Sequence, residues 1–170
     1  MKKIISLLTV CLLIGGIAVC QNPPASPRVS AEGKNIKIEY GQPSKKGRVL
    51  FGPEGSEALE KYGKVWRIGA NKSTEITFSK DGTFGGKPVK AGSYSLFAIP
   101  NENDWTIILN SVLGQSGAYD YEKNKGKDVL SITVPKKTYK NSEEKMTFRV
   151  EKSSLDFQWD NVGFSVPTKF

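Results

Sequence analysis

The chain has 170 residues, with 25 Lys and Arg against 17 Asp and Glu, a formal net charge of +8 and no histidine. Its two cysteines, Cys11 and Cys20, both lie in the first twenty residues. The rest of the chain therefore cannot form a Ser-His-Asp triad, a Cys-His pair or an ordinary zinc site. Catalysis would need carboxylate, Lys, Tyr or Ser groups, and the scattered lysines argue against a nucleic-acid interface.

The first twenty residues have the pattern of an export signal. Two lysines precede an apolar run over residues 4–14, and small residues follow it. This predicts a secretory signal peptide at residues 1–20, because the apolar run is too short to span a bilayer. Cleavage after Cys20 is one outcome. Acylation of Cys20 as a lipid anchor is the other, although Val19 is bulkier than the residue that normally precedes such a cysteine. Both outcomes place the protein in the periplasm or outside the cell.

The remaining chain has room for one domain. Residues 21–30 contain three prolines and no apolar periodicity, which predicts a tether. Residues 31–170 are predicted to form a single domain, since a segment of this length can bury one core. No stretch after the signal peptide predicts a transmembrane segment.

Short strands dominate the pattern of the domain. Ile36, Ile38 and Tyr40 alternate with polar residues, as in a strand with one buried face. Similar patterns occur at residues 49–51, 65–70, 74–79, 93–99, 105–109, 129–134, 146–150, 155–159 and 162–166. Turn signals such as Asp81-Gly82 separate several of them. The arrangement predicts an all-β fold, an antiparallel β-sandwich of jelly-roll-like character.

One short connecting helix is predicted in the sandwich. Ser56 is a favourable N-cap, and Ala58 and Tyr62 would share one side of a helix over residues 56–62. At about two turns, such a helix only connects strands. Residues 110–127 are polar and are predicted to form a loop.

The most unusual stretch runs from Tyr62 to Asn71 and combines aromatic, cationic and amide groups in a strand pattern. Alternation would bury Trp66 and turn Arg67 to the other face, with Gly69 leaving room beside it. Two interpretations of Arg67 stay open. The arginine either ties down backbone carbonyls or a buried carboxylate, or it binds the carboxylate, phosphate or sugar of a ligand with Asn71 as amide partner.

A pocket around Arg67 follows from this stretch. The Lys-Gly-Arg run at positions 46–48 is expected to fold near it, where aromatic faces would take sugar CH surfaces. The predicted ligand-binding residues are Tyr40, Lys46, Arg48, Trp66, Arg67, Asn71 and Tyr94. The sequence identifies no catalytic residue and predicts no cofactor. It predicts no metal site either, because lysines interleave with the acidic residues of segment 120–128.

Two runs carry a resemblance to a known family. They are Trp66-Arg67-Ile68-Gly69-Ala70-Asn71 and Ala91-Gly92-Ser93-Tyr94-Ser95-Leu96, and they occur together with the run from Tyr40 to Arg48. In these runs the chain resembles a secreted bacterial family of domains of unknown function, number 2911 (DUF2911). The resemblance covers nearly the whole chain after the signal peptide, but the position of Ile68 is often Thr in the family. It implies a compact secreted β domain and supplies no reaction.

These observations favour a secreted or envelope-associated β-sandwich that binds a carbohydrate or a small anionic ligand without catalysis. A basic surface attracts anionic partners. A hydrolase that uses carboxylate or Tyr chemistry is the first alternative, and a structural interaction protein of the envelope is the second. Nucleic acid is not an expected partner, and the sequence does not predict an oligomeric state.

Overall fold

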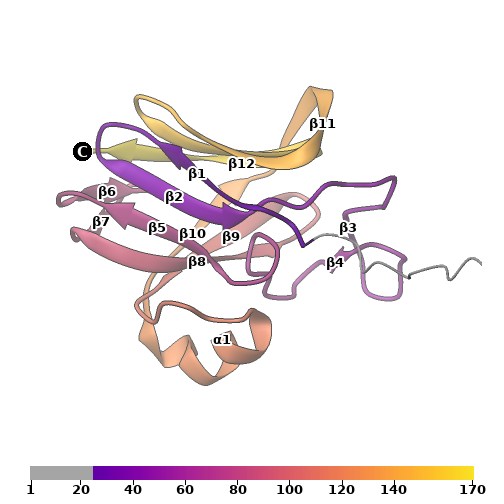
Figure 1. The fold of residues 1–170 in the computed structure, drawn as a ribbon, viewed down its shortest axis with the longest axis horizontal. Coiled ribbons are helices and arrows are strands. Elements are labelled where there is room, and N and C mark those ends of the chain that lie inside the picture. The colour runs from indigo at the N-terminus through magenta and orange to yellow at the C-terminus, as the bar shows by residue number, and fades with distance from the viewer. Residues whose placement is uncertain (1–24) are drawn as a thin grey trace, which may run out of the picture.

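The structure, a computed structural model, describes residues 25–170 (Figure 1). The predicted signal peptide at residues 1–20, with Cys20, lies outside the described residues. Within them, no helix is long and apolar enough to cross a membrane. The strands are β1 (Arg28–Glu32), β2 (Ile36–Gly41), β3 (Phe51–Gly52), β4 (Glu60–Lys61), β5 (Thr74–Phe78), β6 (Gly82–Phe84), β7 (Lys87–Val89), β8 (Gly92–Pro100), β9 (Asp104–Asn110), β10 (Asp128–Pro135), β11 (Lys137–Val150) and β12 (Ser154–Lys169). The helix α1 (Ala118–Asn124) and the 3-10 turn η1 (Lys125–Lys127) lie between β9 and β10.

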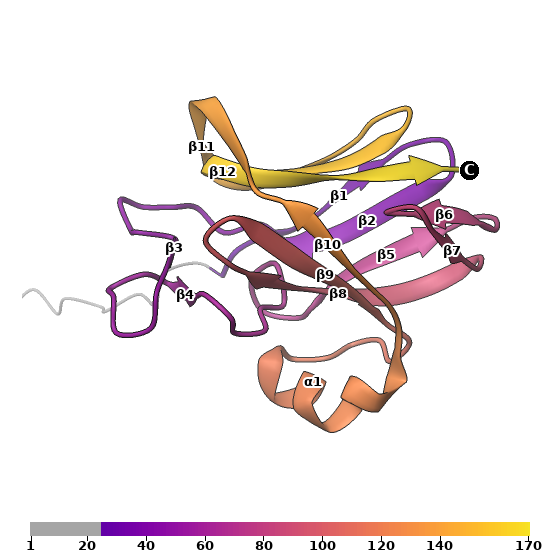
Figure 2. The ribbon, with the colours of Figure 1, turned by 180° about the vertical axis from the view of Figure 1, so that it is seen from behind.

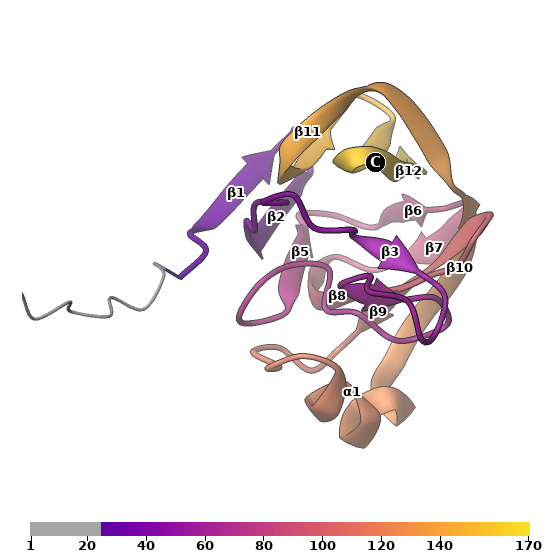
Figure 3. The same ribbon diagram turned by 90° about the vertical axis from the view of Figure 1, so that its right-hand side faces the viewer.

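The strands form two main layers. The larger sheet has six antiparallel strands in the order β1-β2-β5-β8-β9-β10, and the smaller has four in the order β11-β12-β6-β7. Figures 1 and 2 show the β11–β12 hairpin lying over the larger sheet, and Figure 3 shows the larger sheet curving beneath it. The short parallel pair β3–β4 stands apart at one end. The predicted all-β antiparallel fold with one short helix is confirmed.

Alternation along the strands builds the core between the layers. In β5, Thr74, Ile76 and Phe78 are buried while the residues between them are half-buried, and Ile76 lies opposite Ile38 of β2. In β12, Phe157 and Phe164 are fully buried and stack at 5.0 Å between ring centroids. Full burial of such a side chain contributes about 1.5–3 kcal/mol, so these inward faces hold the two sheets together.

A cluster of aromatic rings fills the core near the β3–β4 pair. Phe51 of β3 packs edge-on against Trp105 of β9, with centroids 4.8 Å apart, and against Trp66 at 5.5 Å. Trp66 stacks on Trp159 of β12 at 6.0 Å. Edge-on and stacked rings attract one another beyond their burial. We refer to Phe51, Trp66, Trp105 and Trp159 as the aromatic cluster.

The helix predicted at residues 56–62 is wrong. Ser56 does accept a bond from a backbone amide, that of Ala58 at 3.3 Å, but it caps only a turn that begins at Pro53. The amides of Leu59 and Glu60 then donate to the carbonyls of Val49 and Leu50, at 2.9 and 2.8 Å. These bonds to a distant segment hold the chain extended as β4, and tertiary pairing overrides the local propensity.

The helix forms instead within the segment predicted as a polar loop. The Asp120 carboxylate accepts a bond from the Ser116 amide at 2.7 Å at the start of α1. Tyr121 is buried against Phe97 of β8, with ring centroids 4.8 Å apart. In Figure 3, α1 lies on the outer side of the larger sheet. A single buried ring gives little amphipathic signal in the sequence, because most of a short helix's stability comes from tertiary packing.

The strand predicted at residues 65–70 is also wrong, although Trp66 and Ile68 are both buried as expected. Only Trp66 pairs like a strand residue: it exchanges backbone bonds of 2.7 and 2.9 Å with Ala98. At Ile68 the φ angle is 49°, a left-handed conformation that is a true outlier for a β-branched residue. The backbone turns there, and the Ile68 carbonyl accepts a bond from the Thr74 hydroxyl at 2.8 Å.

Two boundaries also differ from the sequence pattern. The two strands predicted at residues 155–159 and 162–166 form one long strand, β12, which continues through Asp160 despite its φ of 57°. The register between β11 and β12 shifts near this point. At the other end of the domain, β1 begins at Arg28, inside the segment predicted as a tether.

Candidate functional site

A cavity with a volume of about 310 Å³ opens beside the aromatic cluster. It lies between the β2–β3 loop, the β8–β9 turn, the segment between β10 and β11, and the middle of β12. We call it the aromatic cavity. Its lining residues are Lys45, Gly47, Arg48, Val49, Leu50, Phe51, Tyr62, Asn101, Trp105, Lys136, Asp160, Asn161 and Val162.

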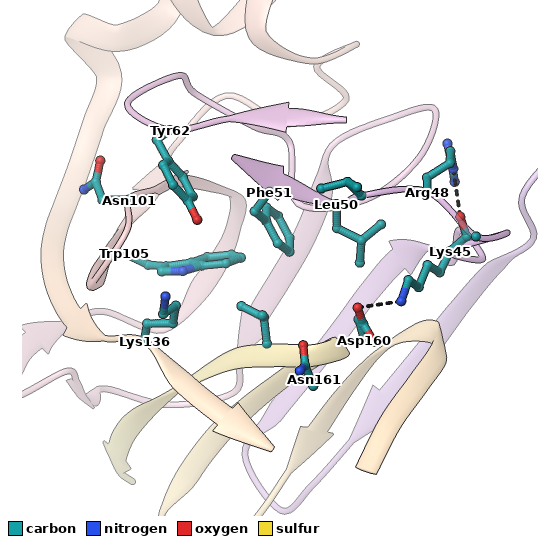
Figure 4. A pocket seen from close by; sticks show the side chains of 13 residues that line it. Lys45, Arg48, Leu50, Phe51, Tyr62, Asn101, Trp105, Lys136, Asp160 and Asn161 are labelled. Atoms are coloured by element: carbon teal, nitrogen blue, oxygen red, sulfur yellow. Dashed lines mark hydrogen bonds and ion pairs between the residues drawn. The ribbon is translucent and has the colours of Figure 1, made fainter. Parts of the chain in front are cut away.

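Rings gather at one end of the aromatic cavity and charges at the other. Figure 4 shows Phe51, Tyr62 and Trp105 close together, with the ion pair of Lys45 and Asp160 farther along. Trp105 is fully buried, and its Nε1 has no hydrogen-bond acceptor among residues 25–170. A buried donor without a partner costs free energy, so the Trp105 N–H is a local cost of packing this ring in the aromatic cluster.

The charges of the aromatic cavity are mostly positive. Its one lining carboxylate, Asp160, is neutralised by Lys45, whose Nζ lies 2.7 Å from Oδ2. The bond from Lys45, with a second from the Ser142 hydroxyl, holds the pKa of Asp160 below its usual value. Arg48 and Lys136 also line the cavity and form no ion pair within the described part of the chain. The cavity therefore offers cations and rings together.

A smaller cavity of about 190 Å³ lies on the other side of the β3–β4 pair. We call it the Arg67 cavity. It shares Arg48 with the aromatic cavity, and two members of the aromatic cluster form part of its wall. Its lining residues are Ser26, Pro43, Arg48, Leu59, Glu60, Trp66, Arg67, Gly69, Ala70 and Trp159.

Backbone carbonyls hold the two arginines of the Arg67 cavity. Arg67 Nε donates to the Gly69 carbonyl and Nη1 to the Ser116 carbonyl, both at 3.3 Å. Arg48 Nε donates to the Lys45 carbonyl at 2.9 Å, and Nη2 donates to the carbonyl of Ser44 at 2.6 Å. The sequence left open whether Arg67 holds backbone carbonyls or binds a ligand. In the structure its guanidinium donates to two carbonyls and also lines a cavity.

Glu60 is the carboxylate of the Arg67 cavity. Burial raises its pKa to about 7, while the positive charges of Arg67, Arg48 and Lys61 oppose the rise. Its carboxylate has no hydrogen bond or ion pair with any residue in the range 25–170. A carboxylate with this pKa changes its charge near neutral pH.

Three of the seven predicted ligand-binding residues line one cavity. Arg48, Trp66 and Arg67 meet in the Arg67 cavity, although Trp66 is only 4% exposed. The other four line neither cavity. Asn71 lies at the edge of the Arg67 cavity, since its Nδ2 donates to the carbonyl of the lining residue Ser26 at 3.2 Å.

Tyr40 and Tyr94 lie elsewhere, whereas Lys46 lies between Lys45 and Gly47, which line the aromatic cavity. Tyr40 belongs to the core, and its hydroxyl accepts a bond from the Phe148 amide at 3.2 Å. Lys46 is exposed, with a φ of 50° that turns the loop. Tyr94 packs on Phe78, with centroids 6.0 Å apart, in a part of β8 that does not reach the cavities.

The sequence did not single out several residues that line the cavities. In the sequence, Tyr62 belongs to a predicted helix and to the Tyr62–Asn71 stretch. Trp105 is only the first residue of a predicted strand. Asn101, Lys136 and Glu60 carried no signal, because turn residues and surface lysines are common and Glu60 was placed in a helix. Only the pairing of distant segments brings these side chains to one end of the sandwich.

Comparison with known proteins gives one match. Residues 22–168 match the family described as "Protein of unknown function (DUF2911)", which confirms the resemblance seen in the sequence. No curated protein and no solved structure matches the chain. The matched segment includes every residue that lines the two cavities. The family description names no ligand and no reaction.

Proposed function

Because the chain belongs to the DUF2911 family, whose description names no activity, we propose a function from the geometry: the protein is a binding module that takes a small anionic ligand or a carbohydrate in the aromatic cavity. The single observation that carries the proposal is a cavity of about 310 Å³ whose lining combines the rings of Phe51 and Tyr62 with Arg48 and Lys136, two cations that form no ion pair among residues 25–170. Ligand pockets typically measure about 300–1,000 Å³ and place a few polar groups among apolar ones.

The lining also favours a ring-bearing acid, such as an acidic sugar. The ring of Tyr62 suits the CH groups of a sugar ring, and Asn101 and Asn161 offer amides to its hydroxyls. Lys136 and Arg48 would then pair with a carboxylate or another anionic group. These features support binding more than hydrolysis.

The hydrolase alternative needs two carboxylates near one bond, about 5–10 Å apart. Asp160 is the one carboxylate that lines the aromatic cavity, and Lys45 already neutralises it. A carboxylate that is ionised and paired with an ammonium has no proton to donate, and its lowered pKa makes it a poor general base at neutral pH. This arrangement favours a non-catalytic role.

We further propose that the protein acts after export. The charged and apolar pattern of residues 1–20 supports this location. The mass of the mature protein distinguishes the two fates of Cys20: cleavage after it leaves Gln21 first, whereas an anchor adds acyl chains to Cys20. An uncleaved cytoplasmic protein would contradict the proposal.

A ligand screen on variants tests the site. Sugars, acidic sugars and simple organic acids are screened by thermal shift, and hits are measured by calorimetry. Lys136→Met keeps the side-chain stem and removes the cation, so the affinity for an anionic hit is expected to fall about tenfold or more. Lys80→Met is the matched control, since Lys80 is exposed and lines neither cavity.

Tyr62→Leu is the second variant. It keeps an apolar side chain and removes the ring that lines the cavity, and is also expected to weaken binding of a hit. A hit that binds the wild type, Lys136→Met and Tyr62→Leu with equal affinity contradicts the proposed site. A complete failure of the screen favours the structural alternative.

A further inference from the structure

The Arg67 cavity contains two charges that the proposed function does not use, those of Glu60 and Arg67. Glu60 lines it without a hydrogen bond or ion pair among the described residues, although Arg48 and Arg67 line the same space. Both arginines are near enough to oppose the rise in the Glu60 pKa, but neither lies within 4.0 Å of its carboxylate oxygens. Glu60 and the two arginines therefore line one cavity without forming an ion pair.

The hydrogen bonds of the three cations explain this separation. The carbonyls of Gly69 and Ser116 hold the Arg67 guanidinium. Lys61, next to Glu60 in β4, turns its Nζ to the carbonyls of Ser56 and Ala58, at 2.7 and 2.6 Å. A guanidinium has five N–H donors, and Arg48 and Arg67 each use two in these bonds, so donors remain for a ligand.

The backbone is shaped to keep Arg67 in this place. Ile68 takes its strained φ of 49° directly after Arg67. Gly117 takes a φ of 118°, and a Cβ there would lie 2.6 Å from Arg67 Nη1. The φ angle favours glycine, and a side chain there would have to push the guanidinium away from its present position. Strain of this kind is found where a local geometry serves a site.

Three kinds of small ligand can be compared against these charges. An anion alone would bind the guanidiniums but would lie near an ionised Glu60. A cation alone would bind Glu60 but would be repelled by two guanidiniums. A molecule that carries both groups satisfies all three side chains, because each of its charges meets an opposite one.

We infer that the Arg67 cavity binds a small zwitterion, an α-amino acid, with its ammonium group on Glu60 and its carboxylate on Arg48 and Arg67. The volume of about 190 Å³ limits the ligand to a few heavy atoms. Leu59 and the edges of Trp66 and Trp159 supply an apolar wall for a short side chain.

The affinity for an amino acid should depend on pH. The groups that face Glu60 are Arg48 from the β2–β3 loop, Arg67 from the segment before β5, and Lys61 from its own strand. Glu60, with a pKa of about 7, becomes neutral as the pH falls and then no longer attracts an ammonium group. The affinity is therefore expected to drop below pH 7, by up to about tenfold per pH unit.

Glycine, acetate and methylammonium are the probes, measured by calorimetry on the purified protein at pH 8. Glycine is expected to bind about tenfold or more tightly than either of the others. Glu60→Gln should weaken glycine about tenfold or more, since the amide keeps the shape and loses the charge. Glu57→Gln is the matched control, because Glu57 is exposed on the same segment and does not line the cavity.

Several results overturn the inference. Acetate binding as tightly as glycine overturns it, because the site would then take anions alone. Absence of any response to millimolar glycine also contradicts it. Arg67→Gln provides a second test, since it should weaken both glycine and acetate, and unchanged affinities reject the site. Lys136→Met should leave glycine binding unchanged, which separates this inference from the proposed function.

Discussion

The aromatic cavity and the Arg67 cavity flank the same aromatic cluster and share Arg48, yet the carboxylates that line them differ in ion pairing and in the direction of their pKa shift. Asp160 in the aromatic cavity is paired with Lys45 and has a lowered pKa. Glu60 in the Arg67 cavity is unpaired within residues 25–170 and has a pKa of about 7. Two cations line the cavity of Glu60, so the number of nearby cations does not decide whether a carboxylate is paired.

The two carboxylates differ because a cation can approach Asp160 closely and none approaches Glu60 as closely. Lys45 is a flexible ammonium whose Nζ comes within 2.7 Å of Asp160. The planar guanidiniums are fixed on backbone carbonyls, that of Arg48 within its own loop and that of Arg67 on Gly69 and Ser116. A fixed guanidinium lowers the pKa of a carboxylate less than a bonded ammonium does, and burial then dominates at Glu60.

Removal of Trp66, which lines the Arg67 cavity, should have the largest effect. Trp66→Ala empties the centre of the aromatic cluster, where Trp66 is 4% exposed, and is expected to lower the free energy of unfolding by about 3–5 kcal/mol. Urea denaturation measures this change. Val49→Ala is the control, since Val49 is 59% exposed and should change stability by less than about 1 kcal/mol. Equal effects of the two substitutions would show that the cluster does not support the cavities.

Glu60→Gln should stabilise the protein at high pH. The folded pKa of Glu60, about 7, is above its ordinary value of 4.5, so the folded state binds more protons between these values. Wild-type stability therefore falls as the pH rises from 4.5 through 7, and the amide avoids this loss. We expect a gain of roughly 1–3 kcal/mol at pH 8 and almost none at pH 4, measured by urea denaturation. A gain of the same size at both pH values would contradict the assigned burial of Glu60.

Gly117→Ala should damage the Arg67 cavity alone. The φ of 118° is strained for any other residue, and the added Cβ would press on Arg67 Nη1. The expected loss of stability is about 1–3 kcal/mol, seen as a lower denaturation midpoint. Gly126→Ala is matched to it, since a Cβ at Gly126 meets nothing within 4 Å and its φ is not in the left-handed region. If the two variants are equally stable, Gly117 does not constrain Arg67.

The smallest effect is expected for Asp160→Asn, and its pH dependence should mirror that of Glu60→Gln. Asp160 has a lowered folded pKa, so its contribution is present above its ordinary value of 3.8 and is lost as the pH falls through the folded value. Asn tolerates the φ of 57°, so the substitution mainly removes charge. The variant should lose about 1 kcal/mol at pH 7 and become equal to the wild type in strong acid. A loss of stability that persists in strong acid would show that the substitution disturbs packing rather than charge.

Regular alternation was sufficient to predict most of the fold. The pattern of Ile36, Ile38 and Tyr40 marks β2, and Leu155, Phe157 and Trp159 mark part of β12, because strand residues facing one core repeat every second position. The pattern fails where a distant partner decides the backbone. Leu59 and Glu60 are extended because they bond to Val49 and Leu50, and no local signal reports this pairing.

The candidate site was less accessible to sequence reasoning. The Trp66–Arg67 pair was found because an arginine beside a tryptophan and a glycine is conspicuous, and both residues do line one cavity. The unpaired state of Glu60 could not be predicted, since it depends on where two arginines place their hydrogen bonds. The ion pair of Lys45 with Asp160 joins the β2–β3 loop to β12, and only the folded chain brings these segments together.

The pairing of β12 with β6 has a consequence for how the domain reaches this structure. Thr168 and Lys169 lie opposite Phe84 and Thr83, so the smaller sheet joins two segments that are far apart along the chain. Contacts of long sequence separation must close large loops before they contribute any stability, and β proteins built from them fold in about milliseconds to seconds. Both cavities also depend on β12, through Asp160 and Trp159. Binding competence should therefore appear late in folding, as the last long-range strand docks.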